Sequence, residues 1–197
     1  MDEHAADEYV RRAAQEGWRS RAVYKLMEIQ QKDRVLQAGM TVVDLGAAPG
    51  AWSQFAAGIV GVRGRVIALD VLPMDPLAAV EFIQGDFTEQ ATLEVLERTL
   101  GEQAVDLVLS DMAPNISGVS SVDQPRAIYL AELALDFARN HLRPGGSLVT
   151  KVFQGEGSDA LVTEARAIFE TVRHRKPKAS RDRSREFYLV ARNYRVM

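Results

Sequence analysis

The sequence predicts an α/β fold in which helices cover both faces of a largely parallel β-sheet. Short apolar runs recur at regular spacing, and helical patterns separate them, which is typical of alternating strands and helices. The first run ends in an acidic residue and a glycine-rich turn, as strands of such sheets do beside a ligand. With 197 residues, 47% of them hydrophobic, the chain can form one domain of this kind.

The individual elements follow from the same patterns in chain order. We expect seven strands, near residues 41–45, 65–70, 80–84, 105–110, 146–152, 170–174 and 186–192. Five helices are expected, near residues 20–31, 51–59, 89–99, 124–142 and 158–168. The helical period predicts that the fourth helix packs through Leu130, Leu133, Ala134, Phe137, Ala138 and His141. The segment Arg143-Pro144-Gly145-Gly146 should stop that helix and turn the chain into the next strand.

The composition excludes several classes of protein. The chain has no cysteine, so disulfides and thiolate metal sites are excluded, and no metal is expected. Residues 1–17 are polar and lack the apolar core of a signal peptide, and no apolar run approaches membrane-spanning length. We expect a monomeric cytoplasmic protein with no membrane partner. Its single domain spans residues 1–197, and a basic, helical segment at residues 1–35 packs on the core.

The basic residues gather in two segments, although the formal net charge is −3. Segment 11–25 contains Arg11, Arg12, Arg19, Arg21 and Lys25. Segment 173–185 contains Arg173, Arg175, Lys176, Lys178, Arg181, Arg183 and Arg185. Most basic runs are simply solvated faces. Two of them bracketing one domain favour a surface that binds the phosphates of a nucleic acid.

The glycine-rich turn predicts the kind of cofactor. It runs from Asp44 through Gly46 to Gly50, and a helix-forming segment follows. A dinucleotide loop needs G-x-G-x-x-G, but Ala48 stands where the middle glycine would be, and no lysine follows to make a phosphate loop. The loop therefore favours a nucleoside without a phosphate chain, and S-adenosylmethionine is the predicted cofactor.

Acidic residues follow several predicted strands. Asp44, Asp70, Asp86 and Asp111 fall at or just past strand ends, where ligands of parallel sheets bind. Each one alone could equally be a helix cap or a turn former. Asp70 lies twenty positions after Gly50, the spacing at which an acid accepts hydrogen bonds from ribose hydroxyls. Asp86 is expected to accept a hydrogen bond from the exocyclic amino group of adenine.

The candidate reacting groups are Lys25, Asp111, Lys151 and Glu186. Lys151 interrupts an apolar strand, which is costly unless it is paired, although a lysine that extends to the surface is the alternative. If the last strand is antiparallel, Glu186 lies beside Lys151. Two lysines and two acids around a methyl donor suggest methyl transfer to a weakly acidic hydroxyl. Because an ordinary lysine is protonated at pH 7, Lys151 is either a neutral base or a cation that stabilises an alkoxide.

Five segments carry a family resemblance: RSRAVYKL (19–26), VDLGAAPG (43–50), SDMAPN (110–115), KVFQG (151–155) and SRE (184–186). From about Tyr9 to Ala191 the chain resembles the FtsJ-type 2′-O-ribose methyltransferases of bacterial large-subunit ribosomal RNA. The resemblance implies a Rossmann-like methyltransferase fold that uses S-adenosylmethionine. Its sheet has seven strands and is mostly parallel, with the last strand antiparallel and helices on both faces.

The resemblance also implies roles for single residues. It implies a tetrad of Lys25, Asp111, Lys151 and Glu186, with Lys151 as proton acceptor. It implies S-adenosylmethionine contacts from Gly50, Trp52, Asp70, Asp86 and Asp111. Ala51 departs from the family pattern, which commonly has a second glycine there, and so puts the loop geometry in question. Trp52 is either a wall of the pocket or a buried core residue.

The implied substrate is the A-loop uridine of 23S ribosomal RNA in the assembled large subunit. A small domain without a separate RNA module would then recognise the shape of the particle, and its basic segments would contact phosphates. One rival is an enzyme of the same fold that acts on transfer RNA or an mRNA cap. A non-catalytic RNA-binding assembly factor is a second, and it predicts a broken tetrad. The loop disfavours a third, a nicotinamide oxidoreductase.

Overall fold

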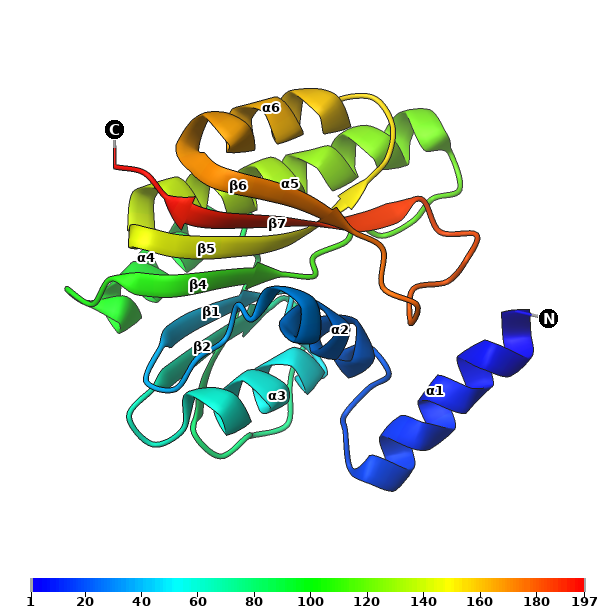
Figure 1. Cartoon of the computed structure of the whole chain (residues 1–197), viewed down its shortest axis with the longest axis horizontal. Helices are drawn as coiled ribbons and strands as arrows, with labels where there is room; N and C mark the ends of the chain where they lie inside the picture. The colour runs from blue at the N-terminus through cyan, green and yellow to red at the C-terminus, as the bar shows by residue number, and fades with distance from the viewer. Residues whose placement is uncertain (1, 197) are drawn as a thin grey trace.

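The computed structural model describes residues 2–196, which form one seven-stranded sheet and six helices (Figure 1). The strands are β1 (Thr41–Leu45), β2 (Arg65–Asp70), β3 (Val80–Gln84), β4 (Val105–Ser110), β5 (Leu142–Phe153), β6 (Phe169–Arg175) and β7 (Glu186–Tyr194). The helices are α1 (Asp2–Glu16), α2 (Val23–Asp33), α3 (Ala51–Val60), α4 (Gln90–Leu100), α5 (Ser120–His141) and α6 (Ser158–Ile168). Every predicted element is present, and α1 lies within the segment 1–35, for which a helical character but no separate helix was predicted. None of these helices is long and apolar enough to cross a membrane.

The sheet topology confirms the predicted fold class. The strand order is β3-β2-β1-β4-β5-β7-β6, and the pairs among β1 to β5 are parallel. The last strand, β7, lies between β5 and β6 and is antiparallel to both. The start of β7 therefore lies at the same edge of the sheet as the carboxyl ends of β1, β2, β4 and β5. Ligands of such sheets bind at that edge.

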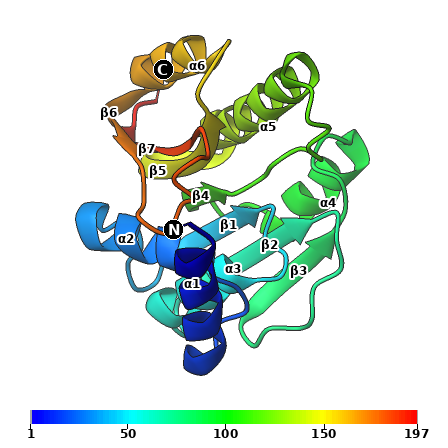
Figure 2. The same ribbon diagram turned by 90° about the vertical axis from the view of Figure 1, so that its right-hand side faces the viewer.

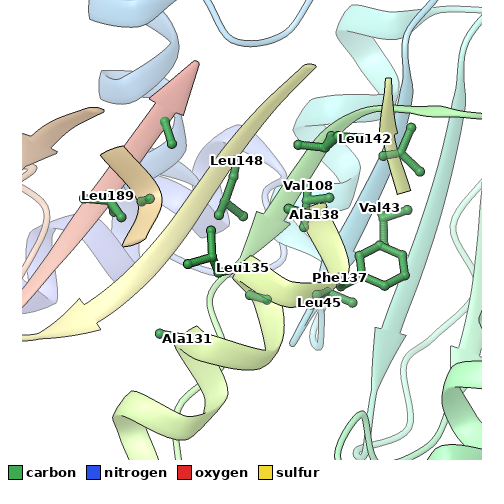
Figure 3. Packing of buried hydrophobic residues seen from close by; sticks show 14 of the residues in the cluster. Val43, Leu45, Val108, Ala131, Leu135, Phe137, Ala138, Leu142, Leu148 and Leu189 are labelled. Atoms are coloured by element: carbon green, nitrogen blue, oxygen red, sulfur yellow. The ribbon is translucent and has the colours of Figure 1, made fainter. Parts of the chain in front are cut away.

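Helices cover both faces of the sheet, as predicted (Figures 1 and 2). On one face, α4, α5 and α6 pack against apolar strand residues, and Figure 3 shows Val43 and Leu45 of β1 near Leu135 and Ala138 of α5. On the other face, α2 and α3 pack against a second cluster that includes Val42. Successive residues of a strand face opposite sides, so β1 contributes to both clusters.

Helix α5 differs from its prediction at its start and on its packed face. It begins at Ser120 rather than at residue 124, because the Asp123 carboxylate accepts bonds from the N–H groups of Ser117 and Gly118 and closes the preceding turn. Ala134, Phe137 and Ala138 are buried as predicted, but Leu130, Leu133 and His141 are only half-buried. The buried face is instead completed by Ala127, Ile128, Ala131 and Leu135.

The start of β5 also differs from the prediction. The strand begins at Leu142 rather than at residue 146, because Leu142 already pairs with Val105 of β4. The Arg143–Gly146 turn then lies within the strand as an irregularity, and regular pairing resumes at Ser147 opposite Leu107. The turn residues were therefore recognised correctly, but they interrupt the strand instead of preceding it.

Helix α1 lies in the segment 1–35 that was expected to be helical, although its own bounds were not predicted because no apolar period marks them. Among its described side chains, only Ala13 is fully buried, in a small cluster with Val23, Tyr24 and Ala51. The ring of Tyr9 lies 5.4 Å from that of Tyr24, which joins α1 to α2. The helix is thus held by a few contacts with the elements that follow it.

The carboxyl end of α2 is fixed to the edge of the sheet by a buried ion pair. Asp33 is 2% exposed, and its two carboxylate oxygens each accept a 2.7 Å bond from the Arg175 guanidinium of β6. Arg173 approaches the same carboxylate at 3.4 Å, and Arg192 of β7 donates to the Asp33 carbonyl at 2.8 Å. Bidentate arginine–carboxylate pairs fix both position and orientation. This contact therefore fixes the helix that carries Lys25.

We expect Asp33→Ala to lower the free energy of unfolding by about 3 kcal/mol, since it leaves Arg175 without its partner in a largely buried site. Urea unfolding of both proteins measures the difference. The control is Glu81→Ala, which removes the ion pair between Glu81 and Arg65. The Glu81 side chain is half exposed, so this variant should lose less than about 1 kcal/mol of stability. Equal losses in the two variants would contradict the anchoring role of Asp33.

Candidate active site

The ionisable side chains at the carboxyl edge lie on one face of the sheet. The cluster under α2 and α3 contains Val42, Val66, Leu109, Val149 and Tyr188 of five strands. Residues an even number apart on a strand share its face. That face therefore also carries Asp44 near the end of β1, Asp70 at the end of β2 and Asp111 just beyond β4. Lys151 near the end of β5 and Glu186 at the start of β7 lie on it as well.

The structure brings the four candidate reacting residues together as two ion pairs. The Lys151 Nζ lies 3.0 Å from Asp111 Oδ1 and donates to the Asp111 main-chain oxygen at 3.2 Å. The Lys25 Nζ lies 2.9 Å from Glu186 Oε1. All four side chains are between 9% and 17% exposed, so each pair is shielded but open to a ligand. Lys151 is paired at the strand end rather than extended into solvent.

Tyr188 joins the two pairs, and the sequence analysis did not find it. Its hydroxyl donates a 2.6 Å bond to Asp111 Oδ1, and its ring lies 5.8 Å from the Lys25 Nζ. In the β5–β7 register Tyr188 stands directly opposite Lys151. Burial, together with Asp111 and Glu186, raises the pKa of Tyr188 well above its ordinary value, so the phenol remains a donor. The sequence did offer one signal for Tyr188, since a residue two positions after Glu186 on the same strand shares its face.

The ionised form of Glu186 is stabilised by the lysines around it. Burial acts to raise its pKa, but Lys25, Lys151 and Lys176 together outweigh that effect and lower it. Lys176 also donates to the main-chain oxygens of Ser184 and Glu186, at 2.7 and 2.5 Å. The start of β7 is thereby fixed in place with Glu186 as a carboxylate.

Gly46 and Gly50 in the turn after β1 are required by their backbone conformation and by close neighbouring segments, before any ligand is considered. Gly46 has φ +74°, and a Cβ there would meet Met112 at 2.9 Å. Gly50 has φ +113°, and a Cβ there would meet the Met74 sulfur at 2.9 Å. Side chains are thus excluded by backbone conformation and by neighbouring segments. The loop geometry comes from these contacts, with the 71–79 connection lying against Gly50.

The two residues after Gly50 pack into the protein core. Ala51, the departure from the family pattern, is 2% exposed, and its methyl group lies in the cluster with Ala13 and Tyr24. It therefore does not intrude on the loop. Trp52 is 3% exposed, and its indole N–H donates to the Ala22 carbonyl at 2.8 Å. Its side chain is a core residue, which was the alternative to a pocket wall.

Asp70 is the last residue of β2 and Asp86 follows β3, and both have oxygens already bonded to the protein. Asp70 accepts 2.9 Å bonds from the N–H groups of Ala48 and Leu72, so it links the loop after β1 to the connection after β2. Asp86 accepts from the N–H and hydroxyl of Thr88, which forms the turn before α4. Carboxylate oxygens can accept more than one bond each, so both residues still have acceptor capacity for a ligand.

Asp44 completes a row of acids in the middle of the edge. It is fully buried, accepts a 2.6 Å bond from the Ser53 hydroxyl through Oδ2, and has no partner for Oδ1 among the described residues. Burial and the nearby Asp111 and Asp70 raise the pKa of Asp44 to about 7 against the opposing effect of Ser53. Three crowded acids with one unpaired oxygen fit a cationic ligand such as S-adenosylmethionine. No cluster of metal-binding side chains occurs within residues 8–196, whose side chains the structure describes.

The comparison with known proteins agrees with this geometry. Residues 18–194 match the model of the FtsJ-like methyltransferase family. The chain belongs to this family. It is 62% identical over 190 residues to ribosomal RNA large subunit methyltransferase E of Azoarcus sp. (strain BH72), covering 96% of this chain and 93% of that protein.

Two further relatives support the same assignment. The protein of the same name from Pseudomonas paraeruginosa is 59% identical over 195 residues, covering 99% of this chain and 94% of that protein. A crystal structure from Plasmodium falciparum, described as a ribosomal RNA methyltransferase, has a TM-score of 0.78 and 29% identity, over 90% of this chain and 98% of that one. As an FtsJ-like methyltransferase, the chain uses a cofactor of the S-adenosylmethionine type.

Several members of the two basic segments have partners within the methyltransferase. Arg19 donates to the carbonyls of Pro49, Asp75 and Pro76, and so ties the loop after β1 to the connection after β2. Arg21 donates to the Ala179 carbonyl, and Arg175 is bound to Asp33. The exposed members of the two segments include Arg11, Lys178, Arg181 and Arg185, of which Arg185 also donates to the Ser120 hydroxyl at 3.4 Å. A count of charges along the sequence does not distinguish the basic residues that hold other segments in place from those on the surface.

We expect the contribution of Glu186 to stability to depend on pH. Its folded pKa lies below the ordinary value of 4.5, so the contribution is present above that pH and is lost as the pH falls through the folded pKa. Glu186→Gln should cost about 1–2 kcal/mol at pH 7, and this cost should shrink as the pH falls below 4.5. Urea unfolding of both proteins between pH 7 and pH 3 provides the test. A difference that stays constant over this range would contradict the assignment.

Proposed function

We propose that this chain transfers a methyl group from S-adenosylmethionine to the ribose 2′-hydroxyl of a uridine in the A-loop of 23S ribosomal RNA. The substrate in this proposal is the assembled large subunit, and the enzyme acts in the cytoplasm as a monomer with one methyltransferase domain. The names of the relatives that are about 60% identical support ribosomal RNA as the substrate. The family resemblance of the sequence supports the ribose and the uridine.

The convergence of two lysine–carboxylate pairs at the ligand edge carries the proposal. Lys151 with Asp111, and Lys25 with Glu186, occupy the same face of the sheet, next to the loop after β1. A ribose hydroxyl is a weak acid, so methyl transfer to its oxygen needs a group that removes the proton and groups that hold the oxygen in place. A non-catalytic RNA-binding factor would not need this complete set.

We assign the removal of the hydroxyl proton to the Lys151 amine, which must be uncharged when it accepts this proton. The carboxylate and the main-chain oxygen of Asp111 hold its nitrogen from two sides, and Tyr188 holds that carboxylate in turn. Lys25, fixed by Glu186, supplies a second positive charge that favours a developing alkoxide. In this assignment Lys151 accepts the proton, and Lys25 stabilises the negative charge on the oxygen.

The cofactor is proposed to lie along the acidic half of the same edge. Asp70 would accept hydrogen bonds from its ribose, Asp86 from its adenine, and the main chain at Gly50 and Trp52 would line the loop. Asp111 would contact it from the side of Lys151. Since the Trp52 indole is buried in the core, only its main chain is available for this contact. When bound, S-adenosylmethionine supplies a methyl group on a positively charged sulfur.

The RNA is proposed to contact the exposed part of the two basic segments. Arg11, Lys178, Arg181 and Arg185 are exposed, and segment 173–185 leads directly into Glu186. Arginine and lysine contacts to phosphates give affinity and orientation but little sequence information. Recognition of the uridine would therefore come from the shape of the ribosomal particle.

We expect Lys151→Ala to lower the rate of methyl transfer by about 10²–10⁴-fold, the usual contribution of a positioned proton acceptor. The affinity for S-adenosylmethionine, measured by calorimetry, should stay within a few-fold of the wild type. Lys151→Arg keeps the positive charge but does not accept a proton at neutral pH, so it should not restore the rate. Substantial recovery by arginine would instead make Lys151 a cationic stabiliser.

Asp70→Ala serves as the contrasting variant. It removes an acceptor for charge-assisted bonds and should weaken cofactor binding by about tenfold or more. Its circular dichroism spectrum should match that of the wild type, since the loss concerns a loop at the sheet edge. Unchanged cofactor affinity in this variant would remove the ribose assignment while leaving the role of Lys151 standing.

The substrate is tested with large subunits from a strain that lacks this protein. Tritium-labelled methyl groups from S-adenosylmethionine should be transferred to these subunits, and mapping should place the label on the 2′-oxygen of one uridine. Naked 23S transcript and transfer RNA serve as comparison substrates in the same assay. Equal labelling of naked transcript would contradict recognition of the particle, and labelling of transfer RNA alone would support the rival substrate.

A further inference from the structure

One buried acid at the ligand edge has no role in the reaction described above. Asp44 lies on β1 between Asp70 of β2 and Asp111 beyond β4, and its register partners are Ala68 and Leu109. Asp70 and Asp111 each lie two residues further along their strands on the same face. Asp44 is therefore flanked on both sides by carboxylates that face the same helices, α2 and α3.

The surroundings of Asp44 supply no compensating positive charge. Helix α3, which covers it, contains no charged residue. It contributes Ser53, whose hydroxyl binds Oδ2 and whose main-chain N–H also favours the ionised form. The charged groups of α2 are directed elsewhere: Lys25 binds Glu186, Glu28 accepts from the Lys178 N–H, Asp33 binds Arg175, and Lys32 is exposed. Lys151 is bonded to Asp111.

The Oδ1 atom of Asp44 is left without a hydrogen-bond partner among the described residues of this acidic row. It is buried, and so is the whole side chain that carries it. A buried carboxylate without a partner is costly, and a neutral carboxyl group is much less so. Burial and the two neighbouring acids accordingly raise the pKa of Asp44 to about 7.

We propose that Asp44 carries a proton when the cofactor site is empty and releases it to solvent when the cationic cofactor binds. The carboxyl O–H bond breaks, the proton passes to the buffer, and the carboxylate then faces a ligand with a positively charged sulfur. Asp44 is a positioning residue in this scheme, because it supports the cofactor electrostatically and takes no part in methyl transfer. The inference rests on the proposed function.

The direct test is the ¹³C NMR titration of aspartate carboxyl groups, with the Asp44 signal identified by its absence in Asp44→Asn. Without ligand the Asp44 signal should titrate with a midpoint near pH 7. With saturating S-adenosylmethionine the midpoint should fall by at least about one pH unit, since a nearby positive charge favours the ionised form. S-adenosylhomocysteine, whose sulfur is neutral, should shift it less.

Calorimetry gives a second readout that does not depend on turnover. The wild type should bind S-adenosylmethionine about tenfold more tightly at pH 8 than at pH 6, because a proton must leave an acid that titrates near neutrality. Asp44→Asn should lose this part of the pH dependence. The α-amino group of the ligand also titrates near pH 8, so the difference between the two proteins is the measured quantity.

Two further variants keep the inference testable if Asp44→Asn does not fold. Ser53→Ala removes the hydroxyl that favours the ionised form, so its Asp44 midpoint should rise and its affinity profile should move to higher pH. Asp159→Asn changes an exposed acid on α6 and should reproduce the wild-type profile. Cofactor binding with an unchanged Asp44 midpoint would overturn this inference alone. Failure of the protein to bind S-adenosylmethionine at all would overturn the proposed function as well.

Discussion

The antiparallel register between β5 and β7 is the constraint on which the site depends. It pairs Lys151 with Tyr188 and Phe153 with Glu186, and so places the start of the last strand at the carboxyl end of β5. A shift by one residue would move Glu186 and Tyr188 to the opposite face, under α5 and α6. Lys25 would then have no carboxylate to bind, and Asp111 would lose the phenol that holds it.

The second requirement is the docking of α2 onto that strand pair. Lys25 comes from a helix that is not part of the sheet, so its position relative to Glu186 depends on contacts elsewhere along α2. Asp33 bonded to Arg175 fixes one end of the helix, and the Trp52 indole fixes the Ala22 carbonyl at the other. Basic residues that look suited to RNA in the sequence thus act as internal supports, which leaves fewer of them for phosphates.

Charge is distributed unevenly along the ligand edge. Asp70, Asp44 and Asp111 follow one another across three adjacent strands, and the lysine pairs lie beyond them on the side of β5 and β7. The acidic half suits a cationic cofactor, and the half with lysines suits a hydroxyl that must lose a proton. Asp111 lies where the two halves meet, bonded to both Lys151 and Tyr188.

The sequence by itself determined the seven strands, the loop after β1 and the acids at the strand ends. These features arise from short-range periodicity and turn chemistry, which a local window of sequence contains. Reasoning from single residues also placed Glu186 beside Lys151, while the family resemblance gathered all four reacting residues. Only the tertiary structure decided that Tyr188 binds Asp111, that Arg175 binds Asp33, and that Ala51 and Trp52 pack in the core. Such contacts join residues up to 142 positions apart, so they depend on strand register and helix docking, which no local pattern encodes.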